Sequence, residues 1–163
     1  MRSREKFVLL LRHGIAEDKG KTSDFDRALT AAGHEKMKRI ARTLPEMFPD
    51  ADTIYSGPLL RAVETAEHVA EAYSKVEVTQ TDALRPEAKA AAFRDLLAAT
   101  GGDNIICVGH EPNLSTIMLA VTGLSDSGRV TLKKGGFYGV RFDSDGDGKL
   151  EWLVPPRVLL RGE

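Results

Sequence analysis

An unbroken apolar run, residues 7–11, lies near the start of the chain and is followed directly by Arg12, His13 and Gly14. A strand that is apolar at every position fits a place inside a parallel sheet, where both of its faces are covered. The tripeptide then falls at the carboxyl end of that strand, which is the edge where open α/β sheets bind their ligands. The run therefore predicts a covered parallel sheet with an imidazole and a guanidinium at its functional edge.

Short apolar runs, typical of strands, alternate along the rest of the chain with longer segments whose apolar residues recur at helical spacing. Apolar runs predict strands at residues 6–11, 52–55, 76–79 and 104–108, and helical stripes follow them at residues 31–48, 58–73, 86–99 and 112–121. Thr30 is placed to cap the first helix and Pro58 to open the second. Alternating segments at residues 137–142 and 149–154 flank a run of Asp and Gly and predict a hairpin. This order predicts a three-layer α/β/α sandwich with a mostly parallel sheet and a C-terminal β-hairpin.

Length and composition are those of an ordinary globular protein. The 163 residues fit one domain, 1–163, and the formal net charge of -1 gives no general attraction to nucleic acid or to a membrane surface. The single cysteine, Cys107, excludes a disulfide within the chain. The apolar run after the charged N-terminus is too short for a signal peptide or a membrane span. We therefore expect a cytoplasmic protein with no nucleic-acid or membrane partner.

Three strand-to-helix junctions each carry a group suited to phosphate. The first carries Arg12 and His13, the second carries Arg61, and the third carries His110 just before Pro112. Because the carboxyl ends of parallel strands meet at one edge, we expect these side chains to converge. The helix that begins near Pro112 adds free backbone N–H groups and a partial positive charge. The pattern predicts an anion pocket in which an imidazole could attack phosphorus.

These motifs resemble the histidine phosphatase superfamily, which also contains the cofactor-dependent phosphoglycerate mutases. The resemblance rests on Arg12-His13-Gly14, on Arg61 within residues 56–62, and on His110 within residues 108–110, in the family's order and at fitting intervals. Residues 26–30 with Gly33, and the run from Gly109 to Leu114, are similar to the SixA-type phosphohistidine phosphatases. The resemblance implies a phosphoglycerate mutase-like fold and brings Arg27 to the phosphate pocket as a third guanidinium.

The reaction implied by the resemblance is a two-step phosphoryl transfer. His13 attacks phosphorus, a phosphohistidine intermediate forms on the enzyme, and water hydrolyses it. Arg12, Arg61, His110 and Arg27 would hold the phosphoryl oxygens, with Gly14 beside the substrate. The guanidinium groups would supply the charge that a metal ion supplies elsewhere, so we expect neither a metal nor a cofactor.

The general acid for an alcohol leaving group stays open. In the mutase and phosphomonoesterase branches a Glu or Asp after the third strand has this role, and Glu87 and Asp82 are the candidates here. A phosphohistidine leaves as imidazole, which can arrive already protonated near neutral pH and needs a dedicated acid less. The partner is therefore either a phosphorylated protein, such as a histidine phosphorelay domain, or a small phosphorylated metabolite. A phosphate-binding protein without activity is the third alternative.

Two other phosphatase or metal motifs fail on spacing. A cysteine-dependent phosphatase needs an arginine six positions after its nucleophile, but Asn113 stands six positions after Cys107. The acidic run at residues 143–148 resembles the start of a calcium loop, but Val154 occupies the twelfth position, where an acidic ligand is required. We expect that run to be a solvated hairpin turn. His34 and His68 lie inside helical stripes and are expected to be structural.

Overall fold

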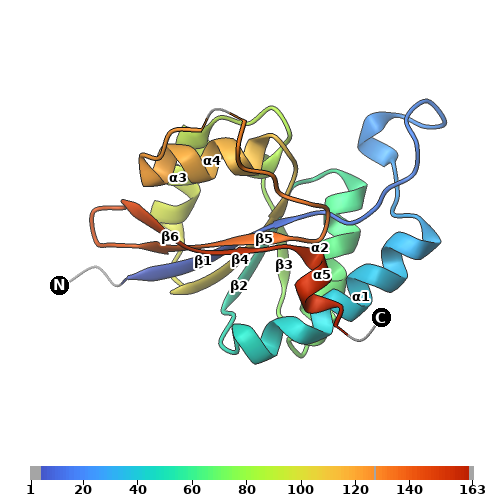
Figure 1. Cartoon of the computed structure of the whole chain (residues 1–163), viewed down its shortest axis with the longest axis horizontal. Coiled ribbons are helices and arrows are strands. Elements are labelled where there is room, and N and C mark those ends of the chain that lie inside the picture. The colour runs from blue at the N-terminus through green and yellow to red at the C-terminus, as the bar shows by residue number, and fades with distance from the viewer. Residues whose placement is uncertain (1–4, 127, 162–163) are drawn as a thin grey trace.

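The computed structural model describes residues 5–126 and 128–161, and strands and helices alternate along them before a final hairpin (Figure 1). The elements are, in chain order, β1 (Lys6–Arg12), η1 (Asp24–Asp26), α1 (Ala31–Met47), β2 (Thr53–Ser56), α2 (Leu60–Ala72), β3 (Val78–Gln80), η2 (Asp82–Leu84), α3 (Ala90–Ala99), β4 (Asn104–Gly109), α4 (Asn113–Thr122), β5 (Phe137–Phe142), β6 (Gly148–Val154) and α5 (Pro156–Leu159). Thr30 caps α1 as predicted, since its side chain accepts a hydrogen bond from the Gly33 amide.

The strands form one six-stranded sheet in the order β3-β2-β4-β1-β5-β6. β1 pairs in parallel with β4, and the pairs β2–β4 and β2–β3 are also parallel. β5 runs antiparallel to β1 and forms the predicted hairpin with β6. The sheet is therefore mostly parallel with an antiparallel margin, and β1 is an interior strand.

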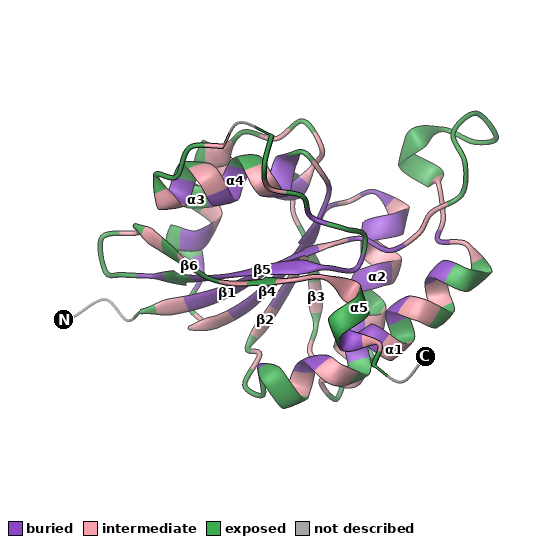
Figure 2. Cartoon of the chain, in the orientation of Figure 1, coloured by how far each residue is buried: buried purple, intermediate pink, exposed green. Residues whose placement is uncertain are grey.

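Helices cover both faces of this sheet and complete three layers (Figures 1 and 2). Leu9 and Leu11 of β1 belong to a core that includes residues of α1 and α2, whereas Val8 and Leu10 belong to a second core with residues of α3 and α4. Alternate side chains of a strand point to opposite faces, so an unbroken apolar run is what this position requires. Within the described residues, no helix has the length and apolar character needed to cross a membrane.

Two predicted helix starts are wrong by a few residues. Pro58 does not open α2, because Leu59 is the N-cap and the helix begins at Leu60. α3 begins at Ala90 and not near Pro86, because residues 85–88 form a turn of their own in which the Ala88 amide donates to the Arg85 carbonyl over 3.0 Å. Glu87 consequently lies in a connecting segment before the helix.

Candidate active site

The three predicted junctions meet at the carboxyl edge of the parallel strands. The His13 amide donates to the Gly109 carbonyl at the end of β4 over 3.0 Å, and the rings of His13 and His110 lie 5.1 Å apart between centroids. Arg61 lies in the first turn of α2, close enough to lower the pKa of both histidines. His13, His110 and Arg61 are only 6%, 2% and 5% exposed. We call Arg12, His13, Arg61 and His110 the junction cluster.

The His13 ring is held in one tautomer. Its Nδ1 atom lies 2.7 Å from the Gly14 carbonyl oxygen, and because a carbonyl only accepts, Nδ1 carries the hydrogen. Burial lowers the pKa of His13 to about 3, and the charges of Arg61 and Arg12 act in the same direction. At neutral pH the Nε2 atom therefore holds a free lone pair, which is the form a nucleophile needs.

The other members of the junction cluster offer buried donors. Arg12 Nε, Arg61 Nε and both ring nitrogens of His110 are inaccessible to water and have no hydrogen-bond partner among the described residues. A buried polar atom without a partner is costly, so a site with several of them is built for a ligand that supplies acceptors. Burial lowers the pKa of His110 to about 4, with Arg61 adding to the effect. The guanidinium N–H groups of Arg12 and Arg61, with the one N–H group of the neutral His110 ring, are donors suited to a multiply charged oxyanion.

The guanidinium groups of Arg12 and Arg61 are each held by a hydrogen bond from a terminal nitrogen to a backbone carbonyl. One terminal nitrogen of Arg12 donates to the Leu132 carbonyl over 2.7 Å, and one of Arg61 donates to the Asp24 carbonyl over 2.8 Å. These bonds orient each guanidinium without using its Nε–H group. The geometry is therefore preorganised, which lowers the cost of binding an anion.

Arg27 lies close to Arg61, and its predicted contact with phosphate stays a prediction. Its Nε donates to the Asp24 carboxylate over 2.9 Å and a terminal nitrogen donates to the Glu17 carbonyl, also over 2.9 Å. The same carboxylate lies 3.4 Å from Arg61, and the charge of Arg27 lowers the pKa of His110. Arg27 thus stands beside the junction cluster, although its own bonds go to the loop before α1.

Gly14, unlike the arginines and histidines predicted for the site, is packed against side chains of α1 and α2. Its amide donates to the Thr65 hydroxyl over 3.1 Å, and a Cβ atom added to it would clash with Met37 Cγ. In this structure Gly14 therefore contributes a close packing contact between β1, α1 and α2. Its predicted contact with substrate stays a prediction.

The two acid candidates lie on the segment after β3, which contacts residues beside the cluster. The Leu84 carbonyl comes within 2.6 Å of a Cβ atom placed on Gly57, and the Ala88 carbonyl accepts from the Asn113 side chain over 2.6 Å. The Asp82 and Glu87 side chains are nevertheless exposed, and Asp82 pairs with Arg85 over 2.7 Å. The structure brings the segment to the site but leaves both carboxylates at its surface.

The start of α4 differs from the expectation of free backbone donors. The Leu114 amide donates to the His110 carbonyl over 2.8 Å, and the Ser115 amide donates to the Glu111 carboxylate over 2.9 Å. These N–H groups are engaged inside the protein, so that expectation is wrong for both of them.

Two residues that the sequence reasoning missed lie at this helix start. Asn113 is buried and its Oδ1 atom has no partner in the described chain, while the charge of Glu111 acts on Arg12. A buried Asn directly after a histidine junction could have been noticed as a polar residue in an apolar stripe. Asp24, which contacts Arg27 and Arg61, is a third residue that the sequence did not predict.

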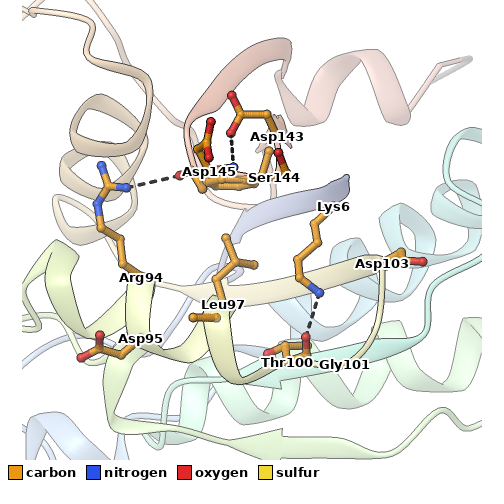
Figure 3. A pocket seen from close by; sticks show the side chains of 13 residues that line it. Lys6, Arg94, Asp95, Leu97, Thr100, Gly101, Asp103, Asp143, Ser144 and Asp145 are labelled. Atoms are coloured by element: carbon orange, nitrogen blue, oxygen red, sulfur yellow. Dashed lines mark hydrogen bonds between the residues drawn. The ribbon is translucent and has the colours of Figure 1, made fainter. Parts of the chain in front are cut away.

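A cavity of about 680 Å³ lies at the opposite edge of the sheet, where β1 and β4 begin (Figure 3). Its two cations, Lys6 and Arg94, donate to carbonyl oxygens of the protein, Lys6 to Thr100 and Gly102 and Arg94 to Gly146 and Ala120. Asp95, Asp143 and Asp145 also line it. With carboxylates present and its cations engaged, this cavity is poorly suited to phosphate.

Titration of the buried histidines gives a first prediction. In an unfolded chain a histidine titrates near about pH 6.5, whereas in the fold the pKa values are about 3 for His13 and about 4 for His110. Between these values the unfolded chain binds more protons, so the free energy of unfolding falls as the pH is lowered. We expect the melting temperature to decline from about pH 6.5 toward pH 4, as measured by circular dichroism.

The variant His13→Asn/His110→Asn should show a shallower decline. His68 is the matched control, because burial lowers its pKa as well, followed in effect by the charge of His34. His68→Asn should flatten the curve less than the double variant, whose two groups have larger shifts. Burial raises the pKa of Asp24, but Arg61 and Arg27 outweigh this and lower it below 3.8, so its own effect comes at more acid pH. A slope unchanged in the double variant would contradict the buried neutral histidines.

Known proteins are similar to this chain in sequence and in fold. Residues 8–86 match the model of the histidine phosphatase superfamily (branch 1). An uncharacterized protein of Picosynechococcus sp. is 32% identical over 162 residues, which are 94% of this chain and 98% of that protein.

Solved structures extend the comparison to the whole architecture. The protein histidine phosphatase SixA complexed with tungstate has a TM-score of 0.85 at 22% identity, over 94% of this chain and 99% of that one. A phosphoserine phosphatase from Entamoeba histolytica, in complex with 3-phosphoglyceric acid, has a TM-score of 0.74 at 20% identity, over 94% and 99%. A mycobacterial glucosyl-3-phosphoglycerate phosphatase has a TM-score of 0.76 at 16% identity, over 93% and 100%. The fold of the chain is that of SixA, and by its sequence match the chain belongs to the histidine phosphatase superfamily.

Proposed function

We propose that this protein is a phosphatase that removes the phosphoryl group from a phosphohistidine of a protein substrate. Membership of the superfamily supports a phosphatase. The observation that carries the proposal is the junction cluster, where a neutral His13 faces buried donors of Arg12, Arg61 and His110 that lack a partner among the described residues. SixA, the structural neighbour complexed with tungstate, is a protein histidine phosphatase.

The reaction has two balanced steps. The lone pair on His13 Nε2 forms a bond to phosphorus as the bond from phosphorus to the substrate imidazole breaks, and that imidazole leaves with a proton. Water then attacks the phosphohistidine on His13, which leaves as neutral imidazole when inorganic phosphate forms. Arg12, Arg61 and His110 hold the equatorial oxygens in both steps, with Arg27 at the rim.

The carboxylates around the site favour phosphohistidine over an ester. An alcohol leaves poorly unless an acid protonates it, but Arg61 and Arg27 outweigh burial and lower the pKa of Asp24, so this carboxyl group is ionised at neutral pH. Glu87 and Asp82 are exposed. A protonated phosphoimidazole needs no such donor.

A small-molecule phosphomonoesterase is the second candidate. Two observations favour it. The segment that carries Glu87 accepts a hydrogen bond from Asn113, at the start of the helix that follows His110, and fold neighbours include a phosphoserine phosphatase and a glucosyl-3-phosphoglycerate phosphatase. In that case the substrate is a phosphorylated metabolite and Glu87 supplies the proton. A phosphate-binding protein without turnover is the third candidate.

Parallel assays separate the three candidates. A phosphohistidine-bearing phosphorelay domain and a panel of phosphate monoesters are incubated with the purified protein, and phosphate release is followed over time. We expect the phosphorylated protein to be the faster substrate and EDTA to leave the rate unchanged, because guanidinium groups supply the positive charge. Faster turnover of a monoester would favour the second candidate, and no turnover of either would favour the third.

Glu87→Gln tests the acid directly. If phosphohistidine is the substrate, its hydrolysis should stay within about twofold of wild type, since no proton donor is required. A loss of monoesterase activity on the order of 10²-fold with unchanged binding would instead assign the acid to Glu87. Asp82→Asn tests the other candidate in the same way, and because this carboxylate is paired with Arg85, we expect it to leave both activities within about twofold of wild type.

A further inference from the structure

Asp24 joins two guanidinium groups at the rim of the junction cluster. Its Oδ1 atom accepts from Arg27 Nε over 2.9 Å, its Oδ2 atom lies 3.4 Å from a terminal nitrogen of Arg61, and its carbonyl accepts from the other terminal nitrogen over 2.8 Å. Both arginine side chains are largely buried, Arg27 at 13% and Arg61 at 5%, whereas the Asp24 side chain is 55% exposed. One surface carboxylate therefore balances two inward-facing cations.

The contacts of Asp24 leave the Nε–H group of Arg61 without a partner. Asp24 bonds the two terminal nitrogens, and Arg61 Nε is a buried atom without a partner in the described chain. Asp24 therefore fixes the direction of the guanidinium and does not use all of its donors, which is the arrangement of a support for that group.

We propose that Asp24 is a positioning residue that keeps Arg27 at the anion site by bridging it to Arg61. This inference rests on the proposed function, in which Arg61 holds a phosphoryl oxygen and Arg27 lies at the rim of the same site. The loop that carries Asp24 projects beyond the sheet in Figure 1, and η1 contacts the body of the molecule at α2. Without the bridge, Arg27 and Arg61 repel each other, and Arg27 is free to turn toward solvent.

A double-mutant cycle on anion binding tests the bridge. Binding of inorganic phosphate is measured by calorimetry for wild type, Arg27→Ala, Asp24→Ala and the double variant. We expect Arg27→Ala to weaken binding about tenfold in wild type but less than about twofold once Asp24 is replaced, because Arg27 depends on Asp24 for its position. Asp24→Asn, which keeps an acceptor but not the charge, should fall between wild type and Asp24→Ala.

Asp26→Ala is the matched control. Asp26 lies in the same short helix, is exposed and accepts from the Ser23 hydroxyl over 2.8 Å, so its removal should leave phosphate binding within about twofold. The inference would be overturned if Arg27→Ala weakened phosphate binding equally with Asp24 present and with Asp24 replaced by Ala. It would also be overturned if Asp24→Ala bound phosphate more tightly than wild type, because Asp24 would then be a competitor of phosphate. A loss of binding caused only by unfolding would appear as a lower melting temperature and would not depend on Arg27.

If only the proposed function is wrong, the experiments give a different pattern of results. Wild type would bind phosphate and the double-mutant cycle could be completed, but the protein would not remove the phosphoryl group from phosphohistidine. Wild type that does not bind phosphate at all would overturn both proposals.

Discussion

His13→Ala is expected to lower the rate of phosphohistidine hydrolysis by a factor on the order of 10⁴ or more, because it removes the atom that bonds to phosphorus. The donors of Arg12, Arg61 and His110 would remain, so phosphate should still bind. Initial rates and phosphate calorimetry on the same preparation measure both quantities. Loss of rate with retained binding separates a nucleophile from a binding residue.

Trapping of the intermediate completes this prediction. Wild type quenched during turnover of a radiolabelled substrate should carry acid-labile phosphate on the chain, and His13→Ala should carry none. His34→Ala is the matched control, since His34 bonds His68 and Glu64 between α1 and α2 and is not a member of the junction cluster. This variant should leave both readouts unchanged. Undiminished hydrolysis by His13→Ala would reject the covalent mechanism.

The convergence of the junction cluster could be foreseen because it follows from topology. An interior parallel strand has a fixed carboxyl edge, so residues that end β1 and β4 must be neighbours, and the His13 amide indeed bonds the Gly109 carbonyl. The apolar run of β1 and the helical stripes were enough to predict three layers. The apolar periodicity of the sequence therefore predicted the architecture, and the architecture in turn predicted that His13 and His110 are neighbours.

The loop contacts could not be foreseen in the same way. Asp24 lies in a polar stretch with Asp18 and Asp26, and nothing in spacing or composition separates it from them. Its contact with Arg61 joins residues 37 positions apart through a loop whose path no periodicity describes. Gly14 shows the same limit, because its close approach to Met37 depends on how α1 packs against β1.

Arg61→Ala is expected to lower kcat/KM by about 10²- to 10³-fold, the usual cost of removing a donor from an oxyanion site. In the proposed mechanism Arg61 offers its buried Nε–H group to the anion. In the structure a terminal nitrogen of Arg61 donates to the Asp24 carbonyl, and the charge of Arg61 lowers the pKa of His110. Its removal therefore takes away one donor to the phosphoryl oxygens and loosens the anchorage of the Asp24 loop. Steady-state kinetics on a phosphohistidine protein measures the effect.

Arg61→Lys separates charge from geometry. A lysine ammonium restores the charge but is a point donor that cannot reach the Asp24 carbonyl and a phosphoryl oxygen in the fixed directions of a guanidinium, so we expect it to recover no more than about tenfold of the loss. Arg94→Ala is the matched control, because Arg94, like Arg61, donates to a backbone carbonyl from a terminal nitrogen but lies at the other edge of the sheet. The kcat/KM of this variant should stay within about twofold of wild type. Full recovery by Arg61→Lys would mean that the site requires only positive charge. Recovery limited as expected would show that its selectivity for the phosphoryl group depends on donors held in fixed directions around His13.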